Sequence, residues 1–144
     1  MEPRKSRTEL RLEAFTRAMR RLEEGIDRVL PRADDEELTM EEEGLIQRFE
    51  YSFELGWKLL QDVATDLNVP RLGGPRAVIR WATAEGWVED GEVWLSMLQS
   101  RNVTTHVYDR ATIQPVLHKI RGAYFRALHG LEEAARNHCA RGSD

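Results

Sequence analysis

Apolar residues recur along this chain at alternating three- and four-residue steps, and this spacing constrains its fold more than any other feature. Side chains at such steps lie along one side of an α-helix, so each segment that carries them buries one face against other helices. The first apolar stripe consists of Leu12, Phe15, Met19, Leu22, Ile26 and Val29. Because proline disfavours continuation of a helix, we predict a first amphipathic helix that ends at Pro31.

Residues that typically cap helices predict where the next three helices begin. Thr39 followed by Glu42 is a capping-box pattern and indicates the start of a long second helix. Gly74-Pro75 suits the cap and first turn of a short third helix, with Gly86 after its last turn. Asp90 can cap a fourth helix. The second helix carries the stripe Leu45, Phe49, Phe53, Gly56, Leu60, Ala64 and Leu67.

A last helix is predicted toward the C-terminus. Its apolar stripe is Ile113, Leu117, Ile120, Tyr124, Leu128 and Leu131. Pro115 places the ordered start of this helix near Thr112, or bends it there. No segment shows a strand-like alternation of convincing length. The sequence therefore predicts an all-α fold, an antiparallel four-helix bundle with an additional short helix, in a single domain over residues 1–144.

The composition, 41% apolar and 32% charged, is typical of a soluble protein rather than a disordered one. No apolar run approaches the length of a membrane span, and the charged stretch from Met1 to Arg7 does not resemble a secretory signal. We therefore expect a cytoplasmic protein without membrane contact. Cys139 has no second cysteine for a disulfide or a zinc site, so we interpret it as incidental, in a polar C-terminal tail. We expect no metal and no cofactor.

Charge is distributed unevenly, although the formal net charge is only −4. Acidic residues crowd into positions 34–43, which we interpret as a docking surface for a basic partner. Three arginines between positions 71 and 80 have no acid between them, and five basic residues between 101 and 126 face only Asp109. This pattern favours a local basic surface, although charge runs are more often solvated faces.

The strongest functional signal is the stretch RNVTTHVY at residues 101–108. The apolar stripe of the fourth helix turns polar there, because the next positions on the same face are Arg101 and Asn102. That stripe is Trp94, Met97 and Leu98. An arginine is rarely placed along a buried stripe unless it is paired or faces a cleft. Asn102 and His106 are four residues apart, so their side chains would meet if the helix continued.

The spacing of Arg101 and His106 sets a geometric condition. Five positions correspond to roughly 140° of rotation on an ideal helix, so the two side chains diverge unless the helix distorts or ends between them. The hydroxyls of Thr104 and Thr105 can bond back to backbone carbonyls, which favours such a distortion. A two-fold dimer offers a second route, because it can bring two copies of the motif to one cleft.

These residue types suit cleavage of RNA without a metal. Imidazole titrates near pH ~6.5 and can accept the proton of a ribose 2′-hydroxyl, which is the role we assign to His106. A guanidinium is permanently cationic and can contact two phosphoryl oxygens at once, which is the role of Arg101. Each residue also has a structural interpretation. Arg101 would pair with Glu54 or another acid on a helix. His106 would donate its ring N–H to exposed carbonyls at a helix end, and Tyr108 would be a half-buried aromatic with its hydroxyl at the surface.

The remaining histidines and the tryptophans are given structural interpretations. His118, His129 and His138 show no helical spacing from an acid or thiol that indicates a metal site, so we expect surface residues. The four tryptophans are interpreted as core or dimer-interface anchors rather than base-stacking platforms. Glu54 and Lys58 are expected to form an ion pair along the helix.

The motif and three further blocks resemble those of a known family. R-N-x3-H-x-Y at 101–108 is similar to the signature of the HEPN superfamily, the higher eukaryotes and prokaryotes nucleotide-binding domains. More narrowly, the chain resembles the small HEPN proteins once called nucleotidyltransferase substrate-binding proteins. The blocks are FEYSFELGWK at 49–58, PRxxIR at 75–80 and WLxM at 94–97. They span most of the chain in the expected order, whereas the short motif alone would be weak.

This resemblance implies a helical homodimer, a cognate minimal nucleotidyltransferase as its partner, and a toxin–antitoxin role. It further implies a metal-independent endoribonuclease that the partner silences by transferring AMP to a tyrosine. On this chain, Arg101 and His106 would be the catalytic pair, Asn102 their polar neighbour, and Tyr108 the modified residue. The alternative is a non-enzymatic subunit that presents a nucleotide or other substrate to the nucleotidyltransferase, with Arg101 and His106 gripping a phosphate.

Overall fold

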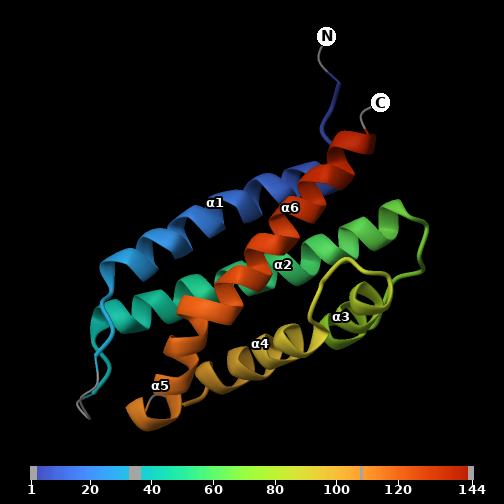
Figure 1. The fold of residues 1–144 in the computed structure, drawn as a ribbon. Helices are drawn as coiled ribbons and strands as arrows, with labels where there is room; N and C mark the ends of the chain where they lie inside the picture. The colour runs from blue at the N-terminus through green and yellow to red at the C-terminus, as the bar shows by residue number, and fades with distance from the viewer. Residues whose placement is uncertain (1–2, 33–36, 108, 143–144) are drawn as a thin grey trace.

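The computed structural model describes residues 3–32, 37–107 and 109–142, and these residues form helices joined by short connections, without a strand among them. The elements are α1 (Arg7–Arg28), α2 (Met40–Asp66), α3 (Pro75–Ala84), α4 (Gly91–Thr104), α5 (Arg110–Lys119), the π-helical segment η1 (Ile120–Tyr124) and α6 (Phe125–Gly142). In Figure 1, α1 and α2 lie side by side, α6 crosses them, and α4 flanks α2 below α3. The predicted all-α bundle with one short helix is confirmed.

The predicted helix starts are also confirmed. The Thr39 side chain accepts the N–H of Glu42, and the Glu42 carboxylate accepts the N–H of Thr39, which completes the capping box of α2. Asp90 accepts the N–H groups of Glu92 and Val93 at the start of α4. Helix α3 begins at Pro75 as predicted, and Gly86 follows its end.

The C-terminal part differs from the prediction. Asp109 caps α5, so this helix begins at Arg110, two residues before the predicted start near Thr112, and Pro115 lies inside it. One π-helical turn then connects α5 to α6, which continues to Gly142. The predicted polar tail is therefore wrong. Cys139 lies within α6 and packs against the core, and burial raises the pKa of its thiol.

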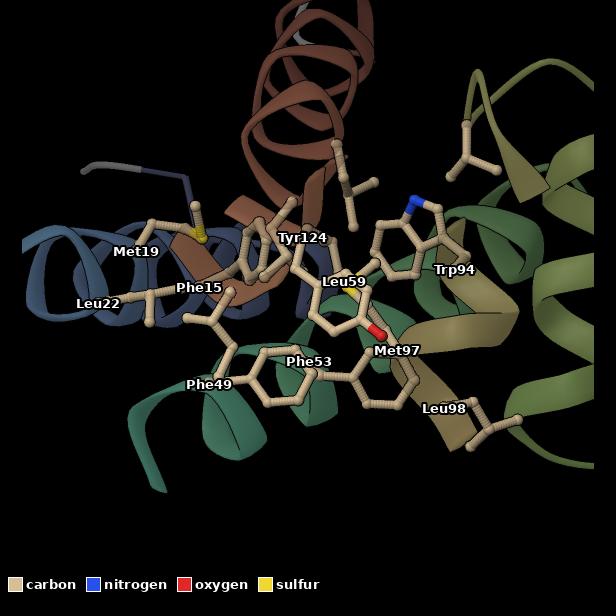
Figure 2. Close-up of a cluster of buried hydrophobic side chains, with 14 of the residues drawn as sticks. Phe15, Met19, Leu22, Phe49, Phe53, Leu59, Trp94, Met97, Leu98 and Tyr124 are labelled. Carbon is tan, nitrogen blue, oxygen red and sulfur yellow. The ribbon is translucent and has the colours of Figure 1, made fainter. Parts of the chain in front are cut away.

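The core contains a cluster of aromatic rings from α1, α2, α4 and η1 (Figure 2), and α6 adds aliphatic side chains to the core. The Phe49 and Tyr124 rings stack at 5.2 Å between centroids, and Phe53 lies 6.1 Å from Trp94. Trp94 is 1% exposed, so its predicted role as a core anchor is confirmed. Full burial of a large apolar side chain contributes about 1.5–3 kcal/mol. The cluster thereby fixes α4 against α2, the two helices that carry the candidate site.

None of the helices within the described ranges has both the length and the apolar composition that a membrane crossing needs.

Candidate functional site

Helix α4 ends at Thr104, between Arg101 and His106. The Thr104 hydroxyl donates to the Arg101 carbonyl at 3.2 Å, and the Thr105 hydroxyl donates to the Asn102 carbonyl at 2.9 Å. The Arg101 carbonyl also accepts the backbone N–H of Thr105 at 3.3 Å, so side-chain and backbone bonds together close the last turn of α4. The expectation that the helix distorts or ends between the two motif residues is confirmed. The continuous turn that would have brought Asn102 beside His106 is not present.

The Arg101 guanidinium lies over the core and beside an acid of α2. Its central carbon is 5.9 Å from the centroid of the Phe53 ring, and its Nη2 atom is 3.8 Å from Oε2 of Glu54. The proposed pairing with Glu54 is therefore present, but as an ion pair longer than a hydrogen bond. The Nε–H of Arg101 is buried and has no acceptor among the described residues. The side chain is 27% exposed, so the guanidinium keeps donors for a ligand.

His106 and Asn102 are both exposed, on the turn and on the last turn of α4. The His106 ring forms no hydrogen bond or ion pair with any other described residue, and no such bond links it to Arg101 within one copy of the chain. Its backbone N–H donates to the Val103 carbonyl at 3.0 Å, which fixes the turn. Tyr108 lies outside the described residues.

The register of α4 on α2 places the motif above an acidic stripe. Thr104 donates to Oε2 of Glu50 at 2.7 Å, one helical turn from the Arg101–Glu54 pair, because the two helices run antiparallel. Next to this contact is a hollow of about 290 Å³. Its walls include Glu43, Glu50, Thr105 and Val107, so the carboxylates face the residues that flank His106.

A buried ion cluster fixes the chain directly after the motif. Glu42 is 2% exposed and accepts from Arg32 at 2.8 Å and from Arg110 at 2.7 Å. Burial alone would raise the pKa of Glu42, but hydrogen bonds from Arg32, from the Thr39 backbone and from Arg110 outweigh burial and lower this pKa to about 2. The sequence predicts only the capping role of Glu42. The cluster joins residues that are 68 positions apart, and no local pattern signals this pairing.

This cluster also corrects the interpretation of the acidic stretch at 34–43. Residues 33–36 lie outside the described ranges. Within the described part, Glu42 is buried against two arginines and cannot meet a partner's surface. Glu37, Glu41 and Glu43 are exposed.

A second buried polar group ties α4 to η1, and the sequence does not predict it. The Tyr124 hydroxyl lies 2.6 Å from the Ser96 hydroxyl and 2.7 Å from the Ser100 hydroxyl. Tyr124 was expected only as an apolar stripe residue. Its hydroxyl has two partners, as a buried phenol requires.

The structure partly corrects the interpretation of the histidines. His138 is wrongly predicted as a free surface residue, because its Nε2 atom is 2.9 Å from Asp66 and its ring meets Trp87 edge-on. His129 is exposed as predicted, but its ring contacts acids three and four positions later in the helix. Across the described ranges, no cluster of three or more histidine, cysteine or acidic side chains is arranged to hold a metal ion. The predicted Glu54–Lys58 ion pair is present at 3.5 Å.

The geometry and the known relatives agree on the class of protein. The family model described as nucleotidyltransferase substrate binding protein like matches residues 10–137. The probable ribonuclease HepT of Haemophilus influenzae is 31% identical over 81 residues, which are 54% of this chain and 56% of that protein. The chain thus matches little more than half the length of this curated relative.

Two solved structures have the same fold. A Thermus thermophilus protein superimposes with a TM-score of 0.74 at 27% identity, covering 85% of this chain and 98% of that one. A Haemophilus influenzae protein, described as showing the fold of a substrate binding domain of a nucleotidyltransferase, has a TM-score of 0.71 at 25% identity. It covers 87% of this chain and 98% of its own.

An all-helical bundle with an Arg-x4-His motif where its fourth helix ends defines a HEPN-like protein, as the resemblance implies. Within that class, the chain belongs to the nucleotidyltransferase substrate binding protein like family.

Proposed function

We propose that this protein is the toxin of a HEPN/minimal-nucleotidyltransferase toxin–antitoxin pair, a metal-independent endoribonuclease that acts as a homodimer in the cytoplasm. One observation carries this proposal: α4 ends between Arg101 and His106, which leaves an exposed imidazole and a guanidinium with unused donors at the same end of the bundle. The named relative, a probable ribonuclease, supports the same activity.

The proposed chemistry assigns one task to each residue. His106 takes the proton of a ribose 2′-hydroxyl, and the resulting oxygen attacks the adjacent phosphorus. The bond from phosphorus to the 5′-oxygen breaks, which gives a 2′,3′-cyclic phosphate and a 5′-hydroxyl that receives a proton from solvent. Arg101 offsets the negative charge that builds on the phosphoryl oxygens. Asn102 follows Arg101 on the last turn of α4 and is exposed, so it is the proposed supporting polar group. Because these groups do not pair within one copy, the cleft is completed by the second copy across a two-fold axis.

Expression without the partner tests the nuclease directly. We expect the wild-type chain to arrest growth and to cleave cellular RNA, and we expect both effects to be lost in His106→Ala and in Arg101→Ala. The matched control is His118→Ala, which changes an exposed histidine of α5 outside the motif and should leave both effects unchanged. A wild type that is harmless and leaves RNA intact would contradict the nuclease.

Silencing is proposed to occur by transfer of AMP from ATP to Tyr108, with release of pyrophosphate. The position of Tyr108 in the sequence, two residues after His106 and within the same motif, supports this. Incubation with the cognate nucleotidyltransferase and ATP should add the mass of one AMP group per chain, and Tyr108→Phe should abolish the gain. An unchanged intact mass of the wild type would count against the modification.

The second candidate is a non-enzymatic subunit that binds a nucleotide or other substrate for the nucleotidyltransferase. The description of the matching family and that of the Haemophilus influenzae fold relative favour it. In that case the Arg101 guanidinium grips a phosphate without any cleavage. The purified chain would then bind nucleotide in an Arg101-dependent manner while RNA stays intact.

A further inference from the structure

A second hollow, with four cationic residues in its lining, lies on the same face of α2 as the Arg101–Glu54 pair. Its volume is about 450 Å³, and it is formed by the start of α1, the end of α2 and the connection to α3. Glu54, Lys58 and Gln61 are spaced by four and three residues, so they follow one side of α2 from the pair into this hollow. Gln61 is about 10 Å beyond Glu54 along the helix axis.

The lining of this hollow carries more positive than negative charge, although Lys58 is paired with Glu54. Its walls carry Arg7, Arg11, Lys58 and Arg71, and Asp62 is the acid among the described lining residues. Asp62 is already paired, because its carboxylate accepts from Nε of Arg11 at 2.9 Å. Arg7 and Arg71 are exposed and have no acidic partner in the described part of the chain. Like charges held together without compensation favour the binding of an anion.

Two buried nitrogen donors in the same walls also lack acceptors. The Trp57 indole N–H and the Gln61 amide nitrogen are both buried without a hydrogen-bond partner among the described residues. The Gln61 carbonyl oxygen accepts the backbone N–H of Leu72 at 3.3 Å, which fixes the orientation of the amide. A buried donor without an acceptor is uncommon in a folded protein, and an anionic oxygen in this hollow would supply one.

We infer that this hollow, here called the basic pocket, binds a backbone phosphate of the RNA strand close to, but distinct from, the phosphate of the scissile bond. The inference rests on the proposed function, because it extends the strand path from Arg101 along the face of α2. A phosphate seated between Arg7 and Arg71 would hold the strand in register while Arg101 and His106 act on a different phosphate. Contacts of this kind position a nucleic acid without reading its sequence.

The test measures binding rather than cleavage, so that it does not depend on the nuclease. Single-stranded RNA of roughly 12 nucleotides, labelled with fluorescein, is titrated with the His106→Ala protein over a range of salt concentrations, with anisotropy as the readout. The double variant Arg7→Gln/Arg71→Gln is made in the same background. Its matched control is Arg17→Gln/Arg20→Gln, which removes two exposed arginines of α1 that do not line the pocket.

We expect the pocket variant to bind the RNA about tenfold more weakly or worse. Its plot of log affinity against log salt should be shallower by about 0.7, which corresponds to the loss of one phosphate contact on a single strand. The control should match the parent protein in both quantities. Equal affinity and slope in the pocket variant, or equal losses in the control, would overturn the inference.

Two further measurements, ATP binding and cleavage kinetics, distinguish an RNA strand from a free nucleotide as the ligand of the basic pocket. ATP that binds with the same dependence on Arg7 and Arg71, and displaces the RNA, would assign the pocket to a free nucleotide and overturn the strand path. In the cleavage-competent chain, the pocket variant should raise KM and leave kcat unchanged. If the wild type does not cleave RNA but the arginine-dependent binding remains, the nuclease fails while the basic pocket stands.

Discussion

Arg101 combines a structural contact with the proposed catalytic task, and its neighbour Glu54 allows the two to be separated. The Arg101–Glu54 pair is partly exposed and 3.8 Å long, so it should contribute no more than about 1 kcal/mol to stability. We predict that Arg101→Gln and Glu54→Gln each lower the free energy of unfolding by about 1 kcal/mol or less in urea titrations. Only Arg101→Gln should abolish RNA cleavage.

A purely structural arginine would give another result. The two variants would then lose stability and activity in parallel, since each breaks the same pair. Loss of cleavage in Glu54→Gln with a normal unfolding curve would instead assign the carboxylate a part in the chemistry.

Glu42 makes the free energy of unfolding depend on pH in the acidic range. Its pKa is lowered from 4.5 to about 2 in the folded chain, so the unfolded chain binds the proton more readily. The stabilisation is therefore complete above about pH 4.5 and is lost as pH falls toward 2. We predict that Glu42→Gln lowers the free energy of unfolding by about 3 kcal/mol at neutral pH, because two arginines lose their shared acceptor.

Urea denaturation at several pH values measures this difference between wild type and variant. The gap should shrink steadily below pH 4.5. Glu41→Gln, one residue away but exposed, should change the free energy of unfolding by no more than about 1 kcal/mol, the contribution of an acid in the first turn of a helix. A gap that is constant with pH would mean that packing, rather than the charge of Glu42, is responsible.

At the scale of helices, sequence patterns within one turn predicted the helix starts correctly, whereas contacts between residues far apart in the sequence could not be predicted. The Thr39 box and the Asp90 cap need only residues within one turn, so the sequence reveals them. The π-helical turn at Ile120–Tyr124 has no short sequence pattern that predicts it, and the hydroxyl of Tyr124 bonds to Ser96 and Ser100 of a helix that is distant in the sequence. In the same way, Arg110 was counted among solvated cations, although it is 7% exposed against Glu42. The sequence reveals the motif because its residues lie within eight positions of one another. The pairing of Arg101 with Glu54 joins two helices, and no local pattern identifies it.

The packing of α2 depends on a close approach at Gly56. A Cβ at Gly56 would lie 3.3 Å from both the Phe15 and Trp94 rings, which are buried and have little room to move. We predict that Gly56→Ala lowers the free energy of unfolding by about 1–3 kcal/mol. Gly130→Ala is the matched change in α6, where a Cβ meets nothing within 4 Å, and helix propensity should make it stabilising by about 1 kcal/mol. Thermal unfolding of both variants measures whether each change lowers or raises the stability. A stabilising Gly56→Ala would show that the Phe15 and Trp94 rings can shift.

At the scale of the whole molecule, α2 organises the functional surface. Along one side of this helix follow the acid-lined hollow beside Thr104, the Arg101–Glu54 pair, Lys58 and the basic pocket. Helix α4 contributes Thr104 to the acid-lined hollow, and α1 contributes Arg7 and Arg11 to the basic pocket. Both helices run antiparallel to α2 (Figure 1). Carboxylates lie at one end of this face and cations at the other. A polyanion such as RNA would be repelled by the acidic hollow and attracted toward the basic pocket.

Because the two motif residues do not pair within one copy, the proposed cleft takes Arg101 from one copy and His106 from the other. Arg101→Ala and His106→Ala proteins, each inactive alone, should then regain activity when mixed and allowed to exchange subunits. Half of the dimers would be mixed and each would hold one intact site, so activity should reach about a quarter of the wild-type value. The measurement is initial cleavage rate against time of mixing, with Arg101→Ala mixed into an Arg101→Ala/His106→Ala protein as the control that must remain inactive. If the mixture stays inactive while mass spectrometry detects mixed dimers, both residues act within one copy, and the turn at Thr105 must bring them together there.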